Sequence, residues 1–294
     1  MSTAAAIGPS ETSEPRQISW RFIMQIGSIV ALAAALFWRV LLDMAHDWWF
    51  EPSLSQGLLL PPLALYIAWI QREKTYAIPA EPDRRGLWLT AFACLLFLAG
   101  RLASEFFLMR FSFVVLLAAL IWTFWGRPRL YSLTFPMLLL ATMVPLPGLV
   151  YNSLAAPLQL FASNIATQIA QIAGTSVYRD GNIMHLAGMS LGVAEACSGL
   201  NSLSALIVGS ILLGYLYCSR PATRVSLFLS AIPLAIFVNV LRVSGTAILA
   251  DYNQEFAMGF YHSFAGWLIF VAGFGLLYVT AWILRAFLEP KETR

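Results

Sequence analysis

The sequence contains little charge. Only 11% of its 294 residues are Asp, Glu, Lys or Arg, and 59% are hydrophobic, whereas soluble domains contain about 25% charged residues. Together with a mean hydropathy of +0.73, this shortage excludes an ordinary soluble domain and places the chain in a membrane. The net charge of +3 is small, and the Lys and Arg residues do not form one patch, so we expect membrane lipids and no nucleic acid among its partners.

Histidine and cysteine are also scarce, with three residues of each. The cysteines, Cys94, Cys197 and Cys218, are too few and too widely spaced for a disulfide framework. There is no HExxH motif, and so few ligands predict no metal site and no cofactor. There is no GxSxG serine elbow either. These absences exclude a zinc peptidase of the HExxH type and a hydrolase built on a serine elbow.

Long apolar runs dominate what remains. A membrane-spanning helix needs about 20 mostly apolar residues. The sequence predicts an all-α integral membrane protein with about eight such helices, at 22–45, 57–71, 86–102, 108–125, 130–149, 197–218, 225–250 and 261–287. We therefore expect a disordered cytoplasmic N-terminus over 1–21, one transmembrane domain over 22–288 and a cytoplasmic tail over 289–294.

The basic residues indicate the orientation of these helices. Of the 18 Lys and Arg residues, 13 fall in the termini and in the three loops that lie on the same side as the termini. Because Lys and Arg are enriched on the cytoplasmic side, both termini are predicted to be cytoplasmic. Within the first helix, Arg39 and Asp43 are spaced i and i+4, which predicts a structural ion pair.

The segment 150–196 differs from the rest. Its first half has apolar residues at helical spacing opposite Gln159, Asn164, Gln168 and Gln171, which predicts an amphipathic helix lying at the outer interface. Its second half contains Asp180-Gly181 between β-favouring residues, which predicts a short outer hairpin leading to Cys197.

The predicted topology brings three reactive side chains to one side of the membrane. Cys197 and His262 open the sixth and eighth helices at their outer ends, and Arg242 lies in the seventh, nine residues before Asp251, or roughly 13 Å deep. A helix N-terminus and neighbouring cations lower the pKa of a thiol. His262 would act as base and then as acid, and Arg242 would hold either the developing oxyanion or a substrate carboxylate. Supporting roles are possible for Glu195, Asn201 and Asn239.

Simpler explanations exist for several of these residues. Cys94 and Cys218 are expected to be packing residues, and His46 and His185 to be interfacial. An arginine in mid-membrane costs about 2.5–3.5 kcal/mol and marks a functional site by default. The alternative for Arg242 is a buried ion pair with Glu195.

Three segments resemble one known family. "GVAEACSGLNSL", "NVLRV" and "YHSFAGW", in this order and each at a helix or its entrance, are similar to the exosortase/archaeosortase family. The resemblance implies a multi-pass cysteine peptidase and transpeptidase of the bacterial inner membrane, with an outward-facing site of Cys197, Arg242 and His262. Many relatives have a His in a "YSHGF"-like segment after the first helix, where this chain has Gln56.

The resemblance also implies the substrates. Relatives process exported proteins that end in a short motif, often Pro-Glu-Pro-like (PEP-CTERM), followed by a hydrophobic helix and a basic tail. The alternative function is a non-enzymatic transporter or assembly factor for extracellular polysaccharide or lipid precursors, in which Arg242 binds an anion and Cys197 is not needed.

Overall fold

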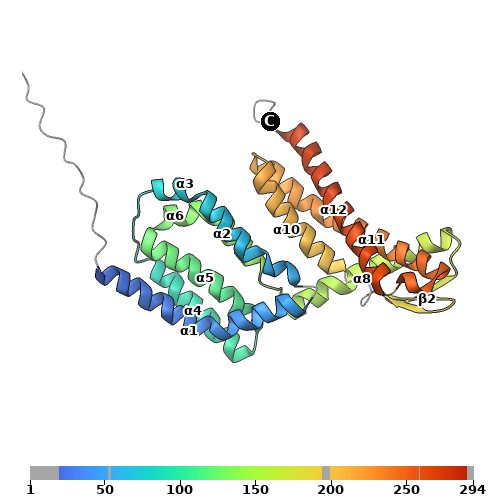
Figure 1. Cartoon of the computed structure of the whole chain (residues 1–294), viewed down its shortest axis with the longest axis horizontal. Coiled ribbons are helices and arrows are strands. Elements are labelled where there is room, and N and C mark those ends of the chain that lie inside the picture. The colour runs from blue at the N-terminus through green and yellow to red at the C-terminus, as the bar shows by residue number, and fades with distance from the viewer. Residues whose placement is uncertain (1–19, 52–53, 194–198, 258, 290–294) are drawn as a thin grey trace, which may run out of the picture. The chain divides into compact units, whose positions relative to one another are not determined.

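The computed structural model describes residues 20–51, 54–193, 199–257 and 259–289 (Figure 1). The chain forms two units, residues 1–43 and 44–294. The first unit contains most of helix α1 (Trp20–Phe50), in which Arg39 and Asp43 are both exposed. Among the ion pairs of the described residues there is none between Arg39 and Asp43, so that prediction is wrong. In the second unit, the end of α1 is joined to α5 by an ion pair between Asp47 and the buried Arg110.

Helices make up nearly all of the second unit. Within the described residues, five helical segments are long and apolar enough to cross a membrane: 27–50, 86–103, 106–125, 221–252 and 264–288. Two shorter apolar segments, 55–70 and 203–217, match two further predicted spans. The all-α membrane fold is confirmed, and the count of eight spans stays a prediction.

In the first half of the second unit, successive helices are separated by short stretches of sequence. They are η1 (Ser55–Leu58), α2 (Leu60–Ile70), α3 (Arg72–Ala77), α4 (Gly86–Ala103) and α5 (Phe106–Trp125). Helices α4 and α5 form an antiparallel pair, in which Gly100 allows close approach because a Cβ there would lie 2.8 Å from the backbone nitrogen of Met109. The chain turns between them at Ser104, which has a left-handed φ of 53°.

The predicted helix 130–149 is not a single helix. The structure has α6 (Arg127–Ser132) and α7 (Thr134–Thr142) in its place, and residues 143–147 are not helical. Pro145 and Pro147 lie in this stretch. Proline has no N–H to donate and disfavours a helical residue before it, so α7 ends at this point and a new helix begins after it.

That new helix, α8 (Gly148–Ile172), is the predicted amphipathic helix, and it packs against α11 through small residues. Its buried face includes Ala162, Ala166 and Ala170, while Asn164, Gln168 and Gln171 are exposed. The predicted hairpin is confirmed as β1 (Val177–Asp180) and β2 (Ile183–Leu186), with Gly181 at φ 59° in the turn. A third strand that was not predicted, β3 (Ser190–Gly192), pairs with β2 in a sheet of order β1-β2-β3.

Three long helices complete the chain: α10 (Gly199–Tyr217), α11 (Pro221–Tyr252) and α12 (Gly259–Leu288), with the short η2 (Gln254–Ala257) between the last two. Each of the three packs against the other two (Figure 1). Gly209 on α10 faces the ring of Phe274 on α12, and Gly273 on α12 faces Val238 on α11. Since consecutive helices reverse direction, the start of α10, the end of α11 and the start of α12 lie at one end of this group.

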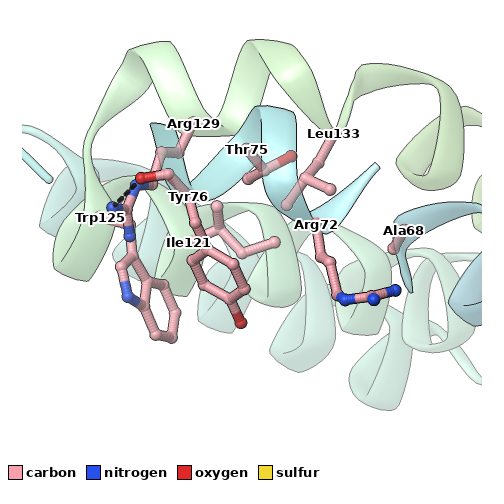
Figure 2. Close-up of a pocket in the computed structure, with 8 residues that line it drawn as sticks. All are labelled: Ala68, Arg72, Thr75, Tyr76, Ile121, Trp125, Arg129 and Leu133. Carbon is pink, nitrogen blue, oxygen red and sulfur yellow. Dashed lines mark hydrogen bonds between the residues drawn. The ribbon is translucent and has the colours of Figure 1, made fainter. Parts of the chain in front are cut away.

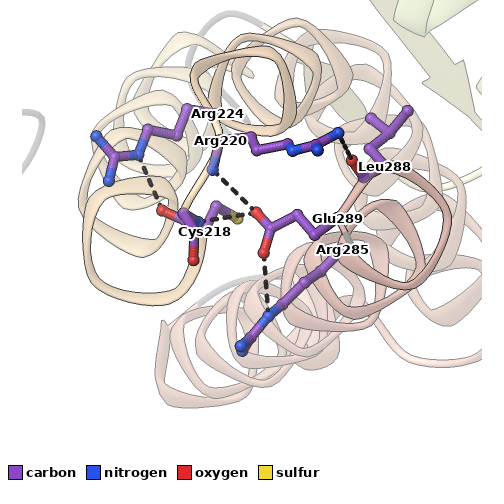
Figure 3. A network of polar contacts seen from close by, with 7 residues as sticks. Cys218, Arg220, Arg224, Arg285, Leu288 and Glu289 are labelled. Atoms are coloured by element: carbon purple, nitrogen blue, oxygen red, sulfur yellow. Dashed lines mark hydrogen bonds and ion pairs between the residues drawn. The ribbon is translucent and has the colours of Figure 1, made fainter. Parts of the chain in front are cut away.

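At the opposite end of the three helices, Glu289 links α12 to the turn between α10 and α11 (Figure 3). Its Oε1 atom accepts hydrogen bonds from the backbone amides of Ser219 and Arg220 at 2.8 and 3.2 Å, and its Oε2 lies 3.3 Å from Nε of Arg285. Burial alone raises the pKa of this carboxyl, but these hydrogen bonds and the guanidinium outweigh burial and lower the pKa. The end of α12 is thereby joined to the turn between α10 and α11.

Candidate active site

Arg242 lies between α11 and α12. Gly266 makes room for it, because a Cβ at this position would be 3.1 Å from Nη2 of Arg242 and 3.3 Å from its Cζ. The guanidinium is therefore in contact with the face of α12 that contains Gly266. The Nε atom of Arg242 is shielded from solvent. An arginine held between two membrane-crossing helices is the arrangement expected of a functional charge.

His262 precedes Gly266 by four residues on α12. Residues spaced i and i+4 share a helix face, so the backbone places His262 one turn from the residue that touches Arg242, toward the start of α12. The structure describes only the helical backbone of His262, and the same holds for Asn201 in the first turn of α10. Glu195 and Cys197 lie outside the described residues.

The described residues on both sides of the segment that contains Cys197 pack against α11. Val193 is buried in a cluster with Val243 and Ala247 of α11, and its N–H donates to the carbonyl of Asn182 at 2.9 Å. On the other side, α10 begins at Gly199, two positions after Cys197, and packs on α11 and α12. Val193 packs in one cluster with Val243, the residue that follows Arg242 on α11. Arg242 and the residues on both sides of the cysteine segment thus belong to one region of the second unit.

Gln56 makes a contact with α10 that the sequence did not predict. Its Nε2 atom donates to Oγ of Ser204 on α10 at 3.1 Å. The adjacent Gly57 is required because a Cβ there would lie 2.1 Å from the indole nitrogen of the buried Trp48. Ser204 lies near the start of α10, seven residues after Cys197 in the sequence, so η1 lies against the beginning of this helix. The signal in the sequence was the position of Gln56, where many relatives have a His.

Asn239 is buried, with 5% of its surface exposed, three residues before Arg242 on α11. Its Oδ1 has no hydrogen-bond partner among the described residues. It borders a small cavity between α8, α10 and α11, which is otherwise lined by apolar residues: Leu158, Ala162, Leu203, Ala235 and Ile236. A buried acceptor without a partner costs about 1–3 kcal/mol, and the cavity, with a volume of about 10 Å³, has room for about one water molecule.

The other two cysteines are not near this region. Cys94 is exposed on α4. Cys218 is buried at the opposite end of α10, where burial and the nearby Glu289 carboxylate raise the pKa of its thiol. The burial of Cys218 agrees with its interpretation as a packing residue, whereas Cys94 lies on the exposed surface of α4.

Comparison with protein families identifies the chain. A family profile described as transmembrane exosortase matches residues 48–279. The chain belongs to the transmembrane exosortase family. No curated protein and no solved structure matches it.

The exosortase match covers most of the chain and includes every candidate residue of the site, from Gln56 on η1 to Gly266 on α12. Together with the long apolar helices, it establishes a multi-pass membrane protein whose family is linked to the processing of sorting signals. The match begins within α1 and ends within α12, so the N-terminal residues and the end of the last helix lie outside it.

Proposed function

We propose that this exosortase is a membrane-embedded cysteine peptidase and transpeptidase that cleaves the C-terminal sorting signals of exported proteins. The observation that supports this most directly is the contact between Arg242 and Gly266, one turn from His262. Such a contact is needed if a cation on α11 and an imidazole on α12 serve one reaction. It supports a shared site on α11 and α12 without reference to the family.

The reaction begins at the thiol of Cys197. Its Sγ attacks the carbonyl carbon of the scissile peptide bond, and Arg242 stabilises the negative charge on the carbonyl oxygen. His262 takes the thiol proton and gives it to the leaving amine as the C–N bond breaks. A thioester between Cys197 and the substrate results, and a nucleophile then releases the substrate by attacking that thioester. The acceptor is water, an amine, or a group on a glycan or lipid.

Asn239, Asn201 and Glu195 are proposed to support the site. Asn239 is buried three residues before Arg242 on α11, so it would act from within the helix bundle and not by direct contact with the peptide. The substrate itself is an exported protein with a short motif, a hydrophobic helix and a basic tail. Its helix would lie in the inner membrane beside the enzyme, which presents the motif at the outward-facing end of α10.

The test separates this enzyme from the competing transporter. Cys197→Ala is expressed with a protein that has such a signal, and both signal cleavage and polysaccharide export are measured. We expect cleavage to be lost while the protein inserts at normal abundance, because Cys197 is the nucleophile. A transporter with an anion site at Arg242 does not need a thiol, so its export would not depend on Cys197. Cys218→Ala and Cys94→Ala are the matched controls and should cleave normally. Full cleavage by Cys197→Ala refutes the proposal.

A further inference from the structure

A second cavity lies far along the chain from the proposed active site, among α2, α3, α5 and α6 (Figure 2). Its volume is about 260 Å³, slightly below the range of about 300–1,000 Å³ of typical ligand pockets. The lining combines two arginines, two aromatic residues and small or apolar ones: Ala68, Arg72, Thr75, Tyr76, Ile121, Trp125, Arg129 and Leu133.

The cavity lies at the depth where membrane helices meet water. Helix α5 is a candidate span that ends at Trp125 and is followed at once by Gly126-Arg127. Apolar α2 ends at Ile70 and is followed by Gln71-Arg72. Trp and Tyr are enriched at this level of a membrane protein, and Trp125 and Tyr76 both form walls of the cavity, with Tyr76 70% exposed.

Arg129 is held rigidly at one side of the cavity. Its Nε donates to the carbonyl of Ile78 at 2.9 Å and its Nη2 to the carbonyl of Tyr76 at 3.5 Å. These two bonds use two of the five N–H groups of a guanidinium, and carbonyls do not neutralise its charge. Among the described residues, no carboxylate forms an ion pair with Arg129. A fixed positive charge with donors to spare is thus presented to the cavity.

Arg72 supplies the second charge. In Figure 2 the ring of Tyr76 lies between Trp125 and Arg72, so the two guanidiniums are on different sides of the cavity. Arg72 stacks on the ring of Trp69 at 4.3 Å and donates to the carbonyl of Trp69 at 3.0 Å. Its nearest carboxylate, Glu73, is 3.9 Å away and 86% exposed, and such a surface pair contributes little.

We propose that this cavity binds the phosphate headgroup of an anionic glycerophospholipid. Arg72 and Arg129 attract the phosphate, and the aromatic walls enclose the glycerol. Ala68 on α2 and Ile121 on α5 lie before the ends of these apolar helices, on the membrane side of Arg72 and Arg129, and contact the first carbons of the acyl chains. Basic pockets between transmembrane helices bind anionic lipids by this combination of charge and apolar contact. The volume suits a headgroup, with the acyl chains lying in the bilayer.

The experiment uses the full-length protein in nanodiscs of neutral phosphatidylcholine, with and without phosphatidylglycerol. The thermal midpoint of unfolding is measured for the wild type, for Arg72→Gln and for Ala68→Phe, which fills the apolar end without changing charge. Arg84→Gln is the matched control, since it removes an exposed positive charge from the same polar region outside the cavity. Bound lipid is counted by native mass spectrometry, and inorganic phosphate is added to neutral nanodiscs in a separate arm.

We expect phosphatidylglycerol to raise the midpoint of the wild type and of Arg84→Gln by about 3 °C. Arg72→Gln and Ala68→Phe should lose at least half of this shift, and Arg72→Gln should retain about tenfold less bound phosphatidylglycerol. All four proteins should have similar midpoints in neutral lipid. The proposal is overturned if phosphatidylglycerol has no effect, or if Arg84→Gln loses as much as Arg72→Gln. It is also overturned if inorganic phosphate alone reproduces the shift, because the ligand is then a soluble anion.

Discussion

At the scale of single residues, Arg242 decides between an enzyme site and a structural ion pair. Its planar guanidinium is in contact with the backbone surface of α12 at Gly266, which fixes its orientation. Orientation matters for an oxyanion because two N–H donors of the guanidinium must converge on one oxygen. A simple ion pair with Glu195 needs the charge and not the planar geometry.

Arg242→Lys is therefore expected to insert at normal abundance and to lose most processing of a signal-bearing substrate. Loss of an oxyanion donor typically lowers the rate by about 10²–10³, and Lys keeps the charge without the paired donors. Glu195→Gln should be milder. The processed fraction, normalised to enzyme level, measures both variants. Near-normal processing by Arg242→Lys would support the ion pair and refute the oxyanion role.

Gly266→Ala tests the same geometry from the other helix. The new methyl group would lie 3.1 Å from Nη2 of Arg242, so the guanidinium must move by a few tenths of an ångström. We expect about tenfold slower processing, because small displacements of catalytic groups are costly, with no loss of stability, because alanine favours a helix over glycine.

Gly275→Ala is its control on the same helix, where an added Cβ has no heavy atom within 4 Å among the described residues. This variant should process substrate at the wild-type rate. Equal loss of activity in both variants would mean that an added methyl group at either glycine disturbs α12, and that Gly266 has no special relation to Arg242.

At the scale of elements, the packing of the three helices that contain the predicted catalytic residues was predictable because it follows from helix order. Cys197, Arg242 and His262 were expected at the same end of three successive helices, and the structure packs α10, α11 and α12 together with Arg242 beside Gly266. The contact of η1 with Ser204 was not predictable, since hydropathy reports which residues lie in the membrane and not which helices touch. The third strand was missed because Ser190–Gly192 is too short for an alternating pattern.

The contact between η1 and α10 has its own test. Gln56→Ala removes the hydrogen bond to Ser204, and such a bond contributes about 0.5–1.5 kcal/mol. We expect processing to fall by up to about tenfold. Gln56→His should restore it, because an imidazole N–H can also donate to the hydroxyl. Gln168→Ala, an exposed position on α8, is the control. Normal processing by Gln56→Ala would show that η1 does not support the site.

Glu289 stabilises the junction of all three helices, and its effect should depend on pH. Because its pKa is lowered in the folded protein, the ionised carboxylate contributes stability above its ordinary pKa. That contribution is lost as the pH falls through the lowered value. Glu289→Gln should therefore unfold at a lower temperature than the wild type at pH 7, and the difference should shrink in acid. Thermal unfolding in detergent at pH 7 and pH 3 measures this, with the exposed Glu255→Gln as control. A difference that is the same at both pH values would contradict this role of the carboxylate.

At the scale of the whole molecule, composition was sufficient to predict the class of protein but not the boundaries of its helices. The scarcity of charge identified a membrane protein, and the family match over residues 48–279 agrees. The predicted span 130–149 was wrong as a single helix because average hydropathy does not register Pro145 and Pro147, which end α7.

The most direct test is to intercept the thioester on Cys197. Membranes containing the enzyme and a signal-bearing substrate are treated with hydroxylamine, and the new C-terminus of the processed substrate is analysed by mass spectrometry. A thioester intermediate predicts a C-terminal hydroxamate at the cleavage site in the wild type, and no cleavage product with Cys197→Ala. Cleavage by Cys197→Ala, or a wild-type product that remains a free carboxylate at saturating hydroxylamine, would contradict acyl transfer through this cysteine.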